Sequence, residues 1–310
     1  MKFWIYPLMV VIAASSYGTL STMVKLAIAG GYTASEAVAS QYIVGFLLAL
    51  VIYLITQRKL PRFNGGFKIV LLAGIFTATT GIVYGQALIY LPASLAVVML
   101  FQFTWIGTLI DCILRKRLPS RPEVISLIVL FLGTILAAGV LDVDLSGIHW
   151  KGWVYGLAAA LSFSLNMTVN TKQVKGMNTT TRLLFVSFIA AVMIGIFQSP
   201  EIIWNGKLFT ESLLFYGLGL GLLGIIIPIY LFVIAVPKVG GAVSSILSAM
   251  ELPVAVIVSV LVLSESLTTL QIVGIVIILL GMCIPTYADI RRNSKRSPRA
   301  RKSFENAEQT

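Results

Sequence analysis

Ten long apolar segments follow one another along the chain, separated by short stretches that hold most of the charged residues. They span residues 4–29, 35–56, 67–91, 92–114, 124–141, 152–171, 183–199, 212–236, 241–263 and 270–288. At about 18 residues or more, each is long enough to cross the hydrocarbon core of a bilayer as an α-helix. None alternates apolar and polar residues as a strand of a membrane barrel does. The pattern predicts an all-α integral membrane protein with ten transmembrane helices.

The first segment shares two features with a secretory signal. Lys2 precedes it, and Ala27-Ile28-Ala29 has the small residues of a cleavage site. A signal core is only about 7–15 residues long, however, and residues 4–29 exceed this length. We interpret the segment as a retained transmembrane helix.

Composition and charge agree with a membrane protein. Hydrophobic residues make up 58% of the chain and charged residues 11%, and these values exclude an ordinary soluble domain. The net charge of +11 comes from basic clusters between the apolar segments, a pattern typical of membrane topology and not of nucleic-acid binding. With the N-terminus inside, only Lys25, Lys151 and Lys207 of the 23 basic residues fall outside. Both termini are therefore predicted to face the cytoplasm, in the plasma or inner cell membrane.

The chain divides into two similar halves and a tail. Ser16-Tyr17 matches Ser162-Phe163, and residues 32–35 match residues 178–181, both at an offset of 146 residues. We therefore predict a five-helix repeat in residues 1–146 and a second in residues 147–290. Because five crossings are an odd number, the second repeat is inverted, as in many secondary transporters. Residues 291–310 are basic and nearly free of apolar residues, so we expect a disordered cytoplasmic tail near anionic lipid.

Glu251 is the acidic residue nearest the centre of a predicted span, where a charge is costly and therefore a functional candidate. Ser244, Ser248, Ala255 and Ser259 share its helical face. One interpretation is a cavity in which Glu251 exchanges a proton or meets a cationic group of the substrate. The other is a protonated Glu251 that only holds helices together.

Further polar residues lie within the spans. Ser162, Asn166 and Asn170 are spaced four apart, so they share a face that either bonds to a neighbouring helix or points into a wet cavity. Tyr84, Gln86 and Trp105 are candidates for lining the same cavity, since Trp105 lies at mid-span and not at the interface.

Two charged residues have simpler interpretations. Asp111 precedes Arg115 by four residues, so an ion pair is the first expectation and a site role the alternative. Lys25 either reaches toward the outer interface or meets an anionic group of a substrate.

Pro228 and Pro253 fall near the middle of two spans and are expected to interrupt them. Gly81 and Gly85 occupy the corresponding part of the first half. Interruptions at matching places in two repeats are typical of a transporter's binding site, so we predict that these four residues act as hinges.

Several kinds of chemistry have no motif in the sequence. No glycine-rich loop ends in Lys-Ser or Lys-Thr, so ATP is not the expected energy source. The chain has one histidine and two cysteines, and the cysteines lie in different segments. We therefore expect no metal, no cofactor and no enzymatic activity.

The residues also resemble a known family. Leu91-Pro92-Ala93-Ser94-Leu95-Ala96, Glu251-Leu252-Pro253 and Ser264-Glu265-Ser266-Leu267-Thr268, together with Gly274 and Gly281, are similar to the EamA repeat of the drug/metabolite transporter superfamily. Family repeats often place Glu and Pro side by side, whereas here Leu252 separates them. The resemblance implies a non-ATP transporter for a small solute, such as an amino acid or an amphipathic compound, that more often exports than imports.

These features together favour a secondary transporter that works by alternating access, with protons as a candidate coupling ion. Its expected partners are a small-molecule substrate and the lipid bilayer. An intramembrane enzyme acting on a lipid or isoprenoid, and a channel, are the alternatives.

The predicted topology can be tested with a protease-cleavable tag fused after Thr310. Because the basic residues place both termini inside, the tag should resist protease added to intact cells and be cleaved once the membrane is opened. Cleavage in intact cells contradicts the predicted orientation.

Overall fold

The computed structural model describes residues 4–58, 65–91, 93–139, 149–174, 176–197, 204–210, 212–264 and 268–294. Within these ranges the regular structure is helical: α1 (Ile5–Gly18), α2 (Leu20–Ala29), α3 (Ala34–Gln57), α4 (Phe67–Tyr90), α5 (Ala93–Phe101), α6 (Phe103–Leu114), α7 (Arg121–Ala137), α8 (Trp150–Asn170), α9 (Thr179–Phe197), α11 (Lys207–Thr210), α12 (Leu213–Gly221), α13 (Ile227–Val239), α14 (Gly241–Leu247), α15 (Glu251–Leu263) and α16 (Thr269–Ser294). The prediction of an all-α protein is confirmed.

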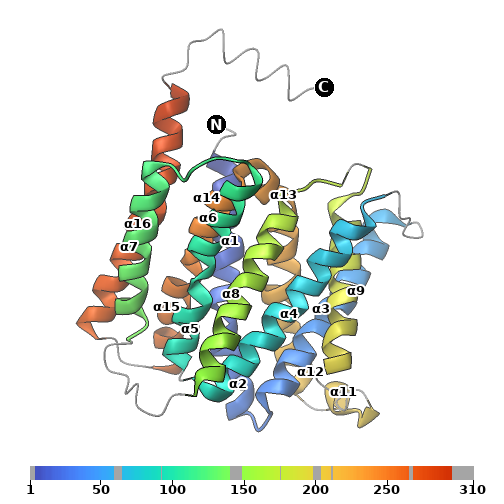
Figure 1. Cartoon of the computed structure of the whole chain (residues 1–310). Coiled ribbons are helices and arrows are strands. Elements are labelled where there is room, and N and C mark those ends of the chain that lie inside the picture. Colours follow the sequence, from blue (N-terminus) through green and yellow to red (C-terminus); the bar gives the residue numbers. More distant parts are fainter. Residues whose placement is uncertain are drawn as a thin grey trace.

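Seven segments of the described chain are long and apolar enough to cross a membrane, which confirms a multi-pass membrane protein. They are Ile5–Ala29, Ala34–Gln57, Phe67–Tyr90, Leu95–Leu114, Thr179–Phe197, Leu213–Val239 and Gly241–Leu263. The other three predicted spans correspond to α7, α8 and α16, which lie beside them in Figure 1. α7 has only 17 residues, and the apolar part of α16 ends at Pro285. The count of ten spans therefore stays a prediction.

The arrangement is a bundle of helices that run between two ends (Figure 1). α1 begins and α16 ends at the same end of this bundle, and the α6–α7 and α13–α14 connections lie at that end too. We call it the cytoplasmic end, following the predicted topology. α16 continues to Ser294, past the predicted end of the last apolar segment at Ala288.

Several spans are interrupted near their middle. The first is divided between α1 and α2 at Thr19, and the fourth between α5 and α6 at Gln102. A π-helical turn, Leu222–Ile226, separates α12 from α13, and a 3₁₀ turn, Ser248–Met250, separates α14 from α15.

The two mid-span prolines lie directly after two of these interruptions. Pro228 is in the first turn of α13, and Pro253 is the third residue of α15. A proline costs little there, because the first four N–H groups of a helix have no partner within the helix. α4, in contrast, is continuous through Gly81 and Gly85, so the expectation of an interruption there was wrong. The nearest break in the first half is at Gln102.

Small residues bring the helices into close contact. α7 and α16 pack along each other, and a Cβ atom added to Gly274 would lie 2.7 Å from the carbonyl oxygen of Gly133. α3 meets α12 where an added Cβ on Gly221 would lie 2.8 Å from the amide nitrogen of Gly45. Buried aromatic rings fill the space between α6 and α8, with the Phe103 and Phe163 ring centroids 4.6 Å apart.

Replacing Gly274 by Leu should destabilise the protein, because the new side chain would push α16 away from the backbone of α7. Overpacking of this kind costs about 1–3 kcal/mol or more. The thermal unfolding midpoint of the purified protein in detergent measures the effect.

Gly195 offers a matched control, because it lies inside α9 with nothing within 4 Å of an added Cβ. Gly195→Leu should leave the midpoint unchanged or raise it, since Leu favours a helix more than Gly. Equal effects of both substitutions would contradict the described α7–α16 contact.

Candidate functional site

Glu251 is the first residue of α15 and directly follows the 3₁₀ turn of residues 248–250. A helix N-terminus favours a negative charge, so the break provides one compensation for this carboxylate. The side chain is partly buried, and no hydrogen bond or ion pair to it occurs within the described part of the chain. In contrast, the described carboxylates of Glu36, Asp111 and Glu123 each pair with a basic residue.

Two helices, α1 and α4, bring other groups close to Glu251. Tyr17 in α1 and Tyr84 in α4 lie near enough to Glu251 for an electrostatic interaction with its carboxylate. Tyr17 in turn lies near Tyr42 of α3. Gly18 allows α1 to pack directly against the backbone carbonyl of Glu251. Tyr84 was predicted for the site, whereas Tyr17 and Tyr42 were not. Their position at mid-span, away from the interfaces where Tyr usually lies, is the signal that could have found them.

Serine hydroxyls before Glu251 are buried without partners. Ser244, Ser245 and Ser248 are fully buried, and none of their Oγ atoms has a hydrogen-bond partner in the described structure. Other hydroxyls within the spans behave differently: Thr77 and Thr108 donate to the carbonyl four residues earlier, at 2.7 and 2.8 Å. The hydroxyls of α14 and the turn after it are therefore available to a group that enters between the helices.

The predicted polar face of α8 bonds to neighbouring helices. Thr80 Oγ1 donates to Ser162 Oγ at 3.0 Å, and Asn166 Nδ2 donates to Thr77 Oγ1 at 3.0 Å. Asn170 Nδ2 donates to Asn166 Oδ1 at 2.8 Å. These contacts place the buried Ser162 and Asn166 in the interface between α4 and α8.

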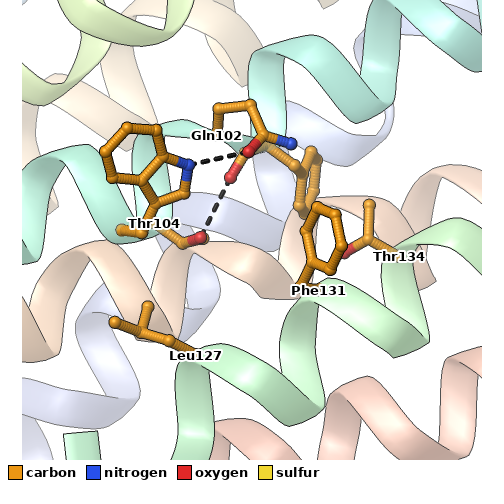
Figure 2. A pocket seen from close by; sticks show the side chains of 7 residues that line it. Gln102, Thr104, Leu127, Phe131 and Thr134 are labelled. Carbon is orange, nitrogen blue, oxygen red and sulfur yellow. Dashed lines mark hydrogen bonds between the residues drawn. The ribbon is translucent and has the colours of Figure 1, made fainter. Parts of the chain in front are cut away.

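Trp105 lines a pocket at the break between α5 and α6. Its indole Nε1 donates to Gln102 Oε1 at 2.7 Å, and 43% of its surface is exposed. Figure 2 shows Gln102 across the pocket from Leu127, Phe131 and Thr134 of α7. The lining residues are Phe101, Gln102, Thr104, Trp105, Leu127, Phe131 and Thr134. Gln86, in contrast, is exposed near the end of α4, and the structure does not place it in this pocket.

Asp111 belongs to an ion network at the cytoplasmic end. It accepts from Arg115 Nε at 2.9 Å, as its spacing predicted, and from Arg117 Nη2 at 2.8 Å. Arg117 also donates to both oxygens of Glu123, at 2.8 Å each. Hydrogen bonds to Glu123 and Asp111 hold the pKa of Arg117 above its usual range.

Lys25 is exposed near the end of α2.

The whole chain has the fold of a solved protein. A crystal structure titled only "Crystal structure of protein" matches it with a TM-score of 0.74, over 94% of this chain and 99% of that chain, at 14% identity. At this identity the match shows a shared fold and no more.

No curated protein matches the chain in sequence. Residues 150–287 match the family model of EamA-like transporters, the family that the sequence resembled. Over these residues, the second half of the chain is similar to the EamA-like transporter family of membrane proteins.

Proposed function

We propose that this protein is a secondary transporter that exports a small metabolite across the cell membrane by alternating access. The observation that carries the proposal is the unpaired carboxylate of Glu251 at a helix break within a span, beside serine hydroxyls that have no partners. Discontinuous helices with free polar groups at mid-membrane are typical of transporter binding sites. The match of residues 150–287 to EamA-like transporters supports transport and leaves the substrate open.

The breaks also support an inverted repeat of two five-helix halves. Gln102, which separates α5 from α6, lies 146 residues before Ser248, where the 3₁₀ turn begins. This offset equals the one at which other short motifs recur in the sequence. Two spans that bend at equivalent places allow one half to rock against the other around a central site.

Glu251 supplies the chemistry that such a site needs. As a carboxylate it binds a proton or the ammonium group of a substrate, and only one of these at a time. The nearby tyrosines offer aromatic faces, which also attract cations. Exchange of the two cations at one carboxylate would couple outward movement of an amine to inward movement of a proton.

The alternatives need different features. An intramembrane enzyme acting on a lipid or isoprenoid would turn over its substrate without solute flux, and a channel would conduct without saturation. Metabolite profiling of cells that lack or overproduce the protein first identifies the solute. Saturable counterflow of this solute in proteoliposomes then favours a carrier over a channel or an enzyme.

Glu251→Gln should abolish the pH dependence of solute flux in proteoliposomes, because the amide cannot take up a proton. Its abundance in the membrane should stay the same, since Gln has nearly the same shape. Flux into proteoliposomes with and without a pH gradient measures the effect.

Glu36→Gln is the control for removal of a carboxylate. Glu36 pairs with Lys207 at 2.9 Å and caps α3, and Gln retains this cap. Its pH profile should match that of the wild type. An unchanged profile in Glu251→Gln would remove Glu251 as the coupling group.

Ser248→Ala should weaken transport without lowering stability, because the hydroxyl that it removes has no partner in the protein. Ser126→Ala should do the opposite. Ser126 Oγ donates to the carbonyl of Gly281 at 2.7 Å between α7 and α16, so its loss should cost about 1 kcal/mol. Half-saturation concentrations for flux and thermal unfolding midpoints separate the two effects, and unaltered transport by Ser248→Ala would count against the serine site.

A further inference from the structure

Arg182 is a buried cation without a carboxylate partner. It lies near the start of α9, only 2% of its surface is exposed, and no ion pair to it is found within the described residues. Arg182 directly precedes the predicted span of residues 183–199, and nothing in the sequence indicated that its side chain is buried.

Neutral oxygens satisfy only part of the guanidinium. Arg182 Nη1 donates to the carbonyl of Lys172 at 3.0 Å, and Nη2 donates to Asn170 Oδ1 at 2.9 Å. Nε is buried and has no partner in the described structure. Because a guanidinium presents a planar fork of donors that matches two oxygens of one anion, a buried Arg with a free donor is suited to binding an oxyanion.

The starts of other helices in the bundle provide a comparison. α3 and α7 begin with the capping carboxylates of Glu36 and Glu123, whereas the first turn of α9 contains no acidic residue. The carboxylates at the cytoplasmic end of α6 and α7 are already bound by Arg115 and Arg117. Within the described residues, this buried guanidinium therefore has no counter-charge, and an unpaired buried charge is costly.

A line of polar groups leads from Arg182 into the bundle. Asn170 contacts both Arg182 and Asn166, and Asn166 donates to the hydroxyl of Thr77 in α4. The carbonyl of Thr77 accepts from the hydroxyl of Tyr42 at 3.1 Å. Because amides and hydroxyls can reorient to donate to an anion, these groups offer further hydrogen bonds next to the guanidinium.

We propose that Arg182 binds an oxyanion of the transported substrate, a carboxylate or a phosphate, when the protein opens toward the cytoplasm. This inference rests on the proposed transport function. In the conformation described here the guanidinium is covered, and rocking of the two halves exposes it to the cytoplasm. The substrate then displaces the carbonyl of Lys172 and the amide of Asn170 from the guanidinium.

The test compares cells that produce the wild-type protein, Arg182→Gln, Arg182→Lys or Lys172→Gln, and profiles the compounds that accumulate in the medium. Lys172→Gln is the matched control, because it removes an exposed positive charge from the same end and keeps the carbonyl that Arg182 contacts. Compounds exported by the wild type should carry a carboxylate or a phosphate, and the profile shows which. Their export should fall at least tenfold in Arg182→Gln, fall less in Arg182→Lys and stay unchanged in Lys172→Gln.

A second measurement separates binding from folding. The unfolding midpoint of each purified protein is recorded with the exported compound and with its analogue in which the acid is an amide or the phosphate is absent. Stabilisation by the acid alone, lost in Arg182→Gln or weakened in Arg182→Lys, supports the proposal even where Arg182→Gln is poorly produced.

Three outcomes overturn the assignment of Arg182. They are export of compounds without an acidic group, normal export by Arg182→Gln, and a loss that follows protein abundance regardless of the charge of the compound. The last would mean that Arg182 only caps α8. If the wild type exports nothing, the proposed function itself fails, and this result is distinct from the other three.

Discussion

A polar group inside a bilayer must find its partner within the protein, because lipid offers none, and this constraint accounts for most of the structure. Threonines within the helices donate to their own backbone. The amides of α8 bond to α4, and charged residues gather in a network at the helix ends. Against this background, a few groups of the described residues have no partner: Glu251, the hydroxyls of Thr22 and of three serines in residues 244–248, and Nε of Arg182. They are the places where the protein can still form a bond with something else.

The same constraint explains how far the sequence could predict the fold. Apolar segments of sufficient length must be helical in lipid, so the segment predicted at residues 241–263 coincides with Gly241–Leu263 of the structure. Some boundaries differ from the predicted ones at polar edges: for example, α13 ends at Val239 and α16 at Ser294, both later than expected.

Helix breaks were predicted less well than helices. Prolines marked two of them, because a missing N–H is visible in the sequence. The breaks at Thr19 and Gln102 have no proline, and α4 tolerates Gly81 and Gly85 without interruption. There the packing of neighbouring helices decides: an added Cβ on Gly81 would contact the Tyr42 hydroxyl, so this glycine serves close packing and not a bend. Propensity within one segment cannot reveal such a contact.

Site residues followed a similar rule. Glu251 was predictable because a charge in an apolar segment is conspicuous, and the Asp111–Arg115 pair because its spacing is local. Arg182 and Tyr17 were missed because their roles depend on which helices surround them. Glu251 and Arg182 both lie in the second half, within the residues that match the family. The first half contributes neutral groups that face them, Tyr17 and Tyr84 near Glu251 and Thr77 at the end of the line from Arg182. If the halves rock against each other, neutral partners can separate from a charge far more cheaply than an ion pair can. A charged site on one half facing a neutral surface on the other is therefore an arrangement that permits repeated opening.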